Sequence, residues 1–100
     1  MMFDPHDEGQ PTYAVLRQRM IALAIRRGAD KTICPSEIAK SFGSHWRSLM
    51  PRVHQVADQL CAERKLVFEK GGISHGQHRP SGHYRLRIAP GNPDAPDAQN

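Results

Sequence analysis

The chain has few cysteines and no long apolar run, and each shortage removes a class of protein. Two cysteines among 100 residues cannot build the disulfide framework typical of small secreted domains. No stretch approaches the roughly 20 apolar residues of a membrane span, and no N-terminal apolar segment resembles a signal peptide. We therefore expect a cytoplasmic protein with reduced thiols and no membrane association.

The sequence also lacks the motifs that mark common catalytic and metal sites. It contains no CxxC or HExxH spacing, no glycine-rich phosphate loop and no paired carboxylates. His75, His78 and His83 could be metal ligands, but phosphate-facing imidazoles are the simpler interpretation. Cys34 precedes an expected helix, yet the sequence places no base beside it. We expect no enzyme activity, no small-molecule substrate, no cofactor and no bound metal.

Acidic residues are scarce in the central part of the chain. All 14 lysines and arginines lie between Arg17 and Arg87, whereas only five acids lie between Thr12 and Ala89. This part therefore carries a net charge of +9, against +4 for the whole chain. A small domain with such a surplus attracts polyanions, of which nucleic acid is the commonest. The alternative is a basic surface that only confers solubility.

Length and composition predict one domain between two tails. Residues 1–11 and 90–100 are polar, contain prolines and hold the other five acids. Neither segment can bury enough apolar surface to offset the entropy of ordering it, so we expect both to be disordered. A single folded domain should occupy residues 12–89.

The first predicted helix spans residues 13–27. Thr12 is its expected N-cap and Gly28 its left-handed C-cap. One apolar face at helical spacing comprises Leu16, Met20, Leu23 and Ala24. Other apolar residues point elsewhere, namely Val15, Ile21 and Ile25, so the helix should have two neighbours. The second neighbour is either a C-terminal hairpin or another copy of the chain, which would make a homodimer through this helix.

Two further helices with a glycine turn between them are expected next. A short helix should begin at Pro35 and end at Gly43, and a longer one should begin near Pro51. The longer helix carries a stripe at helical spacing that should be buried: Val53, Val56, Ala57, Leu60 and Cys61. Trp46 lies in the intervening turn, where we expect its indole to be buried in the core.

Two strands with a basic loop should complete the domain. Residues 66–70 are predicted as one strand, and residues 84–88, which alternate apolar residues with arginine, as its antiparallel partner. The loop from Gly72 to Gly82 contains no acid and predicts a mobile, cationic wing. The predicted fold is therefore an α+β winged helix-turn-helix, with three helices, a small antiparallel β-sheet and a β-hairpin wing.

Several segments resemble a family of small bacterial winged-helix proteins that is catalogued only as a domain of unknown function. The resemblance covers roughly residues 16–88. It is carried by Ile-Cys-Pro-Ser-Glu-Ile-Ala at 33–39, Trp-Arg-Ser-Leu-Met-Pro at 46–51, Leu-Val at 66–67 and Tyr-Arg-Leu at 84–86. The resemblance implies the fold but no activity, cofactor or catalytic residue. The histidine-rich wing looks unusual for the family.

The predicted winged helix-turn-helix fold indicates a surface that binds double-stranded DNA. Arg52 and Gln55, near the start of the third helix, have donor groups suited to base edges. The residues expected at or near DNA are Arg47, Ser48, Arg52, Gln55, Gln59, His75, His78 and Arg79. Asp58 lies on the same helix face and would be repelled by phosphates. We predict a transcription-related DNA-binding protein, and the alternative is a winged-helix docking module for another protein.

Overall fold

The structure is a computed structural model that describes residues 10–91, and these residues form an α+β domain. Its elements in chain order are α1 (Tyr13–Arg27), α2 (Pro35–Lys40), a 3-10 turn η1 (Trp46–Leu49), α3 (Met50–Ala62), β1 (Leu66–Lys70), β2 (Ile73–Gly76) and β3 (Arg85–Ile88). Three helices with a three-stranded antiparallel sheet agree with the predicted fold class and are compatible with a winged helix. Most of the two predicted tails lies outside the described residues, and within residues 10–91 no helix could cross a membrane.

Helix α1 has the predicted bounds, and its start is capped as expected. The Thr12 hydroxyl oxygen accepts a hydrogen bond from the Val15 N–H at 3.2 Å, which satisfies one of the free donors of the first turn. Gly28 ends the helix and its N–H donates to the Ala24 carbonyl at 3.2 Å. Its φ of 117° and ψ of 152° favour glycine, but they are not the predicted left-handed helical conformation.

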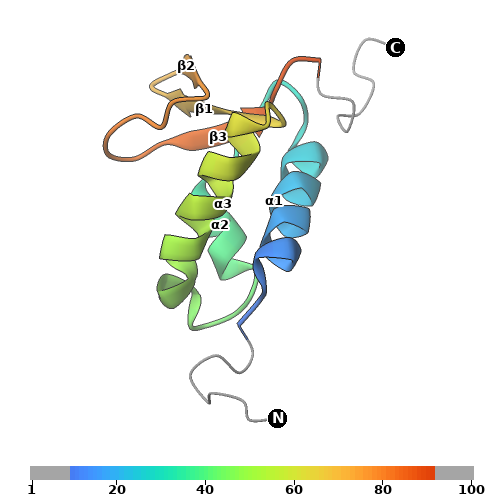
Figure 1. Cartoon of the computed structure of the whole chain (residues 1–100), viewed down its shortest axis with the longest axis vertical. Coiled ribbons are helices and arrows are strands. Elements are labelled where there is room, and N and C mark those ends of the chain that lie inside the picture. Colours follow the sequence, from blue (N-terminus) through green and yellow to red (C-terminus); the bar gives the residue numbers. More distant parts are fainter. Residues whose placement is uncertain (1–9, 92–100) are drawn as a thin grey trace.

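The core lies where the helices meet the sheet. Helices α1 and α3 run side by side, α2 lies behind them, and the sheet crosses one end of the helical layer (Figure 1). The predicted stripe of α3 is entirely buried, as its helical spacing requires. Phe68 of β1 and Leu16 of α1 are among the large side chains with no exposed surface. The helix pattern in the sequence therefore placed most of the core correctly.

The sheet has the strand order β2-β1-β3, with every pairing antiparallel. Leu66 pairs with Ile88 and Phe68 with Leu86, which confirms the predicted partnership of the two apolar strands. Ile33, just before α2, adds an isolated bridge to Leu86, with backbone hydrogen bonds of 2.8 Å in both directions. The outer edge of β3 is thus partly covered by the chain that leads into α2.

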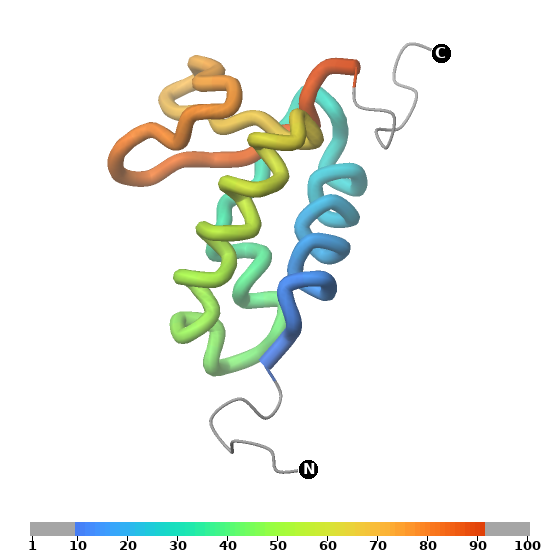
Figure 2. Tube along the Cα trace, viewed as in Figure 1, coloured from blue at the N-terminus to red at the C-terminus, as the bar shows by residue number. Residues whose placement is uncertain are grey.

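Strand β2 was not predicted and changes the form of the wing. Lys70 pairs with Ile73 across Gly71 and Gly72, whose φ values of 60° and 81° suit a two-residue type I′ hairpin turn. The first part of the expected loop is therefore an edge strand, and only residues 77–84 return as a loop to β3 (Figure 2). The glycine pair was the available signal, because two adjacent residues with positive φ favour a tight hairpin.

Two predictions about individual apolar side chains need correction. Trp46 is half-buried rather than fully buried, and Leu49, in the same turn, fills the core position with 4% of its surface exposed. Ile21 and Ile25 of α1 are half-buried and pack against the core cluster. Of the three residues thought to point to a second neighbour, only Val15 is exposed.

Candidate nucleic-acid interface

Helix α3 presents a polar ridge opposite its buried stripe. We define this α3 ridge by its exposed residues Pro51, Gln55, Gln59 and Ala62 together with the half-buried Asp58. The start of α1 borders one side of the ridge, and the loop between β2 and β3 borders the other (Figure 1). The ridge has the position that the sequence predicted for a recognition surface, but it is bordered by groups that the sequence did not place there.

Arg52 and Gln55 are both held by the beginning of α1. The guanidinium of Arg52 donates to the Pro11 carbonyl at 3.1 Å and lies over the Tyr13 ring, 5.6 Å from its centroid. The Tyr13 hydroxyl donates to the side-chain oxygen of Gln55. Arg52 is consequently half-buried, and its charge is directed to the α1 side of the ridge. Pro11, the residue before the Thr12 cap, is buried.

The wing is fastened to α3 by polar contacts. Arg79 Nε lies 3.2 Å from the Asp58 carboxylate, and Gln77 Nε2 donates to the Ala62 carbonyl at 3.1 Å. The charge of Asp58, which phosphates would repel, is therefore offset by Arg79. The loop is not the free cationic arm that the sequence predicted, because the segment from Gln77 to Arg79 lies against the second half of α3.

A second connection between wing and helix lies deeper. His54 Nδ1 and the Tyr84 hydroxyl are 2.6 Å apart, and the Tyr84 ring meets Phe68 edge-on at 5.0 Å between centroids. Burial lowers the pKa of His54, and the positive charge of Arg79 acts in the same direction. Burial also raises the pKa of the Tyr84 hydroxyl. The pair is a neutral hydrogen bond that anchors the base of the wing near pH 7.

A cluster of cations and an indole occupies the turn before α3. Arg47 and Lys40 lie over the Trp46 ring, 4.5 and 4.8 Å from its centroid. Both are exposed, and Ser48 is also exposed, with its hydroxyl donating to the His45 carbonyl at 2.8 Å. Because an aromatic ring has no formal charge, these contacts orient the cations without neutralising them.

The other predicted contact residues are dispersed. His75 belongs to the edge strand β2, and His78 follows it, with its N–H donating to the His75 carbonyl at 3.1 Å. Both side chains are exposed, as is Gln59 on the α3 ridge. Nowhere in residues 10–91 do three His, Cys, Asp or Glu side chains gather into a group that could hold a metal ion. The structure therefore groups Arg52 with Gln55, attaches Arg79 to Asp58, and leaves the two histidines at the outer edge.

Most carboxylates of the described chain are paired with arginine. The pairs are Glu37 with Arg27, Asp58 with Arg79, Glu63 with Arg17 and Glu69 with Arg87. The hydrogen bond from Arg17 lowers the pKa of Glu63, and the Cys34 backbone N–H, followed by Arg27, lowers that of Glu37. These four acids are thus already matched, and the remaining charges, mostly cations, determine the charge that a ligand would meet.

Sequence reasoning missed Tyr13, His54 and Tyr84. Tyr13 bonds to a residue 42 positions away, and His54 to one 30 positions away. Local spacing carries no signal for such contacts.

A family model described as "Protein of unknown function (DUF3253)" matches residues 13–89. No curated protein matches the chain.

Proposed function

The chain belongs to the DUF3253 family, and we propose that this member binds double-stranded DNA through the α3 ridge and the wing, in a transcription-related role. Winged helices present a helix and a neighbouring hairpin to DNA, and the described residues include both elements. The polar ridge and the cations beside it support the choice of nucleic acid as the partner.

The surplus of cations around the ridge carries this proposal. Fourteen lysines and arginines face only five acids between Thr12 and Ala89, and four of those acids are paired with arginine. Arg47 and Arg52 lie instead on aromatic rings near the start of α3. Their charges are available to phosphates, which dominate the affinity of proteins for DNA.

We assign base contacts to the glutamines of the ridge and phosphate contacts to the residues at its borders. Gln55 and Gln59 lie one turn apart on the ridge, and their amides can hydrogen-bond to base edges. Residues at the borders of the ridge contact phosphates in this proposal, namely Arg47, Ser48, Arg52, His75, His78 and Arg79. Arg52 moves from the predicted base contacts to this group because it is held at the α1 side. Phosphate contacts fix register and orientation, whereas the glutamines supply discrimination.

The test is a titration of the full chain with generic duplex DNA at several salt concentrations. If about four phosphates are neutralised, log K should fall against log salt with a slope of roughly −3 to −4. A matched titration with single-stranded RNA of the same length distinguishes the two nucleic acids. The absence of duplex binding at low salt would contradict the proposal and favour the docking alternative.

The second candidate is a docking module that pairs with protein, including a second copy of the chain. The observation that favours it is the exposure of Tyr13 and Val15 on α1, each at 41%. These two residues expose less apolar surface than the three residues that the sequence predicted to point toward a second neighbour. We therefore rank this candidate below DNA binding.

We also propose that the protein acts by binding and not by catalysis, in the cytoplasm. The Cys34 thiol lies 3.1 Å from the Ser36 hydroxyl, and the His54 imidazole is hydrogen-bonded to Tyr84. Cys34 and His54 therefore do not form the thiol–imidazole pair of a cysteine nucleophile. Cys34 and Cys61 are free thiols, which is the state expected in a reducing compartment. An assay for hydrolysis of generic thioesters and phosphoesters should give no activity above the rate in buffer.

A further inference from the structure

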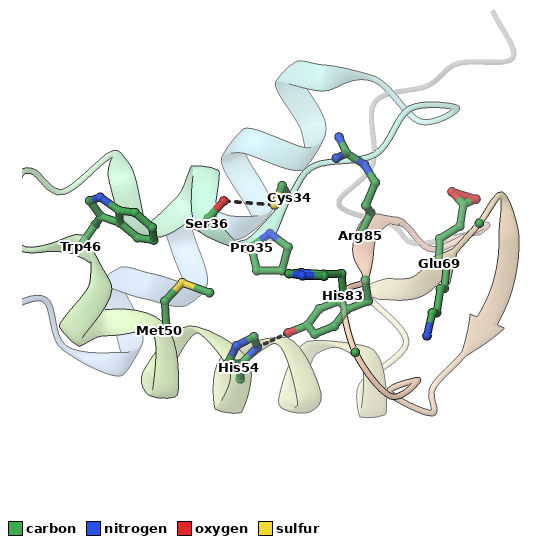
Figure 3. Close-up of a pocket in the computed structure, with 13 residues that line it drawn as sticks. Cys34, Pro35, Ser36, Trp46, Met50, His54, Glu69, His83 and Arg85 are labelled. Carbon is green, nitrogen blue, oxygen red and sulfur yellow. Dashed lines mark hydrogen bonds between the residues drawn. The ribbon is translucent and has the colours of Figure 1, made fainter.

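An elongated pocket of about 990 Å³ lies between the start of α2, the first half of α3 and the base of the wing. Figure 3 shows Trp46 and Met50 at one end and Glu69 at the other, with Pro35 and His83 between them. No residue of the α3 ridge lines the pocket, so it is separate from the proposed DNA surface. Its shape suits a long, narrow ligand, and its volume lies in the range of small-molecule sites.

The wing end of the pocket carries one cation that no carboxylate neutralises. Lys70 lines this end, donates to the Ser81 carbonyl and forms no ion pair in the part of the chain that the structure describes. Two of its three N–H donors therefore remain for a ligand. The neighbouring Gly82 leaves space there, because a Cβ at this position would lie 3.4 Å from the Lys70 amine. Glu69, at the same end, is 3.8 Å from Arg87, so its charge is already matched.

The polar groups in the middle of the pocket are bonded to one another. The Cys34 thiol and the Ser36 hydroxyl lie 3.1 Å apart, and His54 Nδ1 lies 2.6 Å from the Tyr84 hydroxyl (Figure 3). A polar ligand group would compete with these bonds, whereas a hydrocarbon chain leaves them intact. His83 is exposed, so its imidazole can stay hydrated. The middle of the pocket therefore accepts methylene groups without the loss of a hydrogen bond.

The far end of the pocket is apolar. Trp46 and Met50 line it, and both are half-buried against the core cluster. The flexible thioether side chain of Met50 adapts to ligands of different shape. Lys40 and Arg47 lie over the indole, 4.8 and 4.5 Å from its centroid, but neither belongs to the lining. This end therefore suits hydrocarbon and not a carboxylate.

We propose that this pocket binds a free fatty acid of medium chain length, with its carboxylate at Lys70 and its chain extending past Tyr84 and Pro35 to Met50 and Trp46. Because the cation and the apolar end lie at opposite ends of an elongated pocket, a linear chain matches both. A single unmatched cation suits a monocarboxylate better than a dianion, which would need more donors. This site goes beyond DNA binding, and it can be tested on the protein alone.

A series of chain lengths tests whether one ligand contacts both ends. The straight-chain acids from butyric to dodecanoic are titrated into the full chain at neutral pH, without DNA and below their critical micelle concentrations. Affinity, measured by calorimetry, should rise by up to about fourfold for each added methylene until the pocket is filled. Trp46 is the only tryptophan, so its fluorescence reports on the far end. It should not respond to the shortest acids and should respond to the longer ones.

Two lysine variants, one near each end of the pocket, locate the carboxylate. In the wild type, decanoic acid should bind about tenfold more tightly than decan-1-ol, as expected for one charge-assisted hydrogen bond. Lys70→Gln should remove this preference by weakening binding of the acid alone. Lys40→Gln, beside Trp46, is the matched control and should keep the preference. Thermal melts of both variants verify that they fold.

Four results would overturn the proposal. They are no binding of any acid, equal binding of decanoic acid and decan-1-ol, an equal loss in both lysine variants, and a Trp46 response that does not depend on chain length. Since no DNA is present, such a failure would leave the proposed DNA binding untouched.

Discussion

The Asp58 carboxylate on α3 and the Arg79 guanidinium in the wing lie 3.2 Å apart, and this ion pair joins the two elements proposed to meet DNA. Both side chains are substantially exposed, at 45% and 41%. An exposed pair of this kind contributes only about 0–1 kcal/mol to stability. Its greater consequence is electrostatic, because it places a negative charge on the ridge and engages a cation of the wing.

Asp58→Asn should therefore strengthen binding to duplex DNA. The substitution removes a charge that repels phosphates and releases Arg79 to contact them. We expect affinity to rise about tenfold at low salt, equivalent to roughly 1.4 kcal/mol, and the salt slope to steepen by about one. Glu63→Gln is the matched control, since it removes a paired carboxylate on the α1 side of the helix. An equal gain in both variants would mean that only net charge matters, and a loss in Asp58→Asn would place DNA elsewhere.

Gln55→Ala should reduce discrimination between DNA sequences more than it reduces affinity. A lost base contact costs roughly 1–3 kcal/mol at the preferred site and little on other duplexes. Competition binding with a selected site and a scrambled duplex measures the difference. Gln18→Ala, at an exposed position of α1, should change neither value. If Gln55→Ala weakens all duplexes equally, Gln55 contacts the backbone instead.

Trp46→Ala should destabilise the domain less than truncation of a fully buried aromatic residue. Phe68 has no exposed surface, and Phe68→Ala should cost about 3–5 kcal/mol through lost burial and the cavity left behind. Trp46 is half-buried, so we expect a loss of about 1–3 kcal/mol. Denaturant unfolding followed by circular dichroism measures both values. Equal losses would show that the indole is a core residue after all.

Stability should decrease as the pH falls below the ordinary pKa of histidine, about 6.5. The folded-state pKa of His54 is lowered, mainly by burial, so the unfolded chain takes up a proton at a higher pH than the folded chain does. The stabilisation from neutral His54 is therefore complete above about 6.5 and is lost as pH falls toward the lower, folded-state pKa. His54→Gln should flatten this dependence in thermal melts, whereas His75→Gln, at an exposed position, should retain it. A wild-type melting temperature that is constant through this range would refute the assignment.

Self-association, if it occurs, should depend on the exposed apolar end of α1. Val15→Asp should shift any dimer to monomer in sedimentation experiments, because a carboxylate would be buried in the contact. Ile73→Asp is the control, since Ile73 is 67% exposed on the β2 edge. A wild-type chain that stays monomeric at high concentration would eliminate the proposed contact through α1.

The sequence by itself determined the elements whose signals are local. Thr12 and Gly28 marked the ends of α1, and the five-residue apolar stripe defined the buried face of α3. The alternation at residues 84–88 identified β3 and its partner. Such signals can be recognised in the sequence because they involve residues that are close together in the chain. Side chains within two helical turns, or within one strand, specify the local conformation and its buried face.

Only the tertiary structure decided how the candidate site is assembled. The sequence identified Arg52, Gln55 and Arg79 as candidates, but it did not place Tyr13 against the first two or Asp58 against the third. It did not reveal the pocket either, whose walls come from α2, α3 and the wing. These contacts join residues far apart in the chain, and they exist because burial of the common core brings three elements to fixed relative positions. The charges were thus evident from composition, but their partners, and so their availability to a ligand, were decided by the fold.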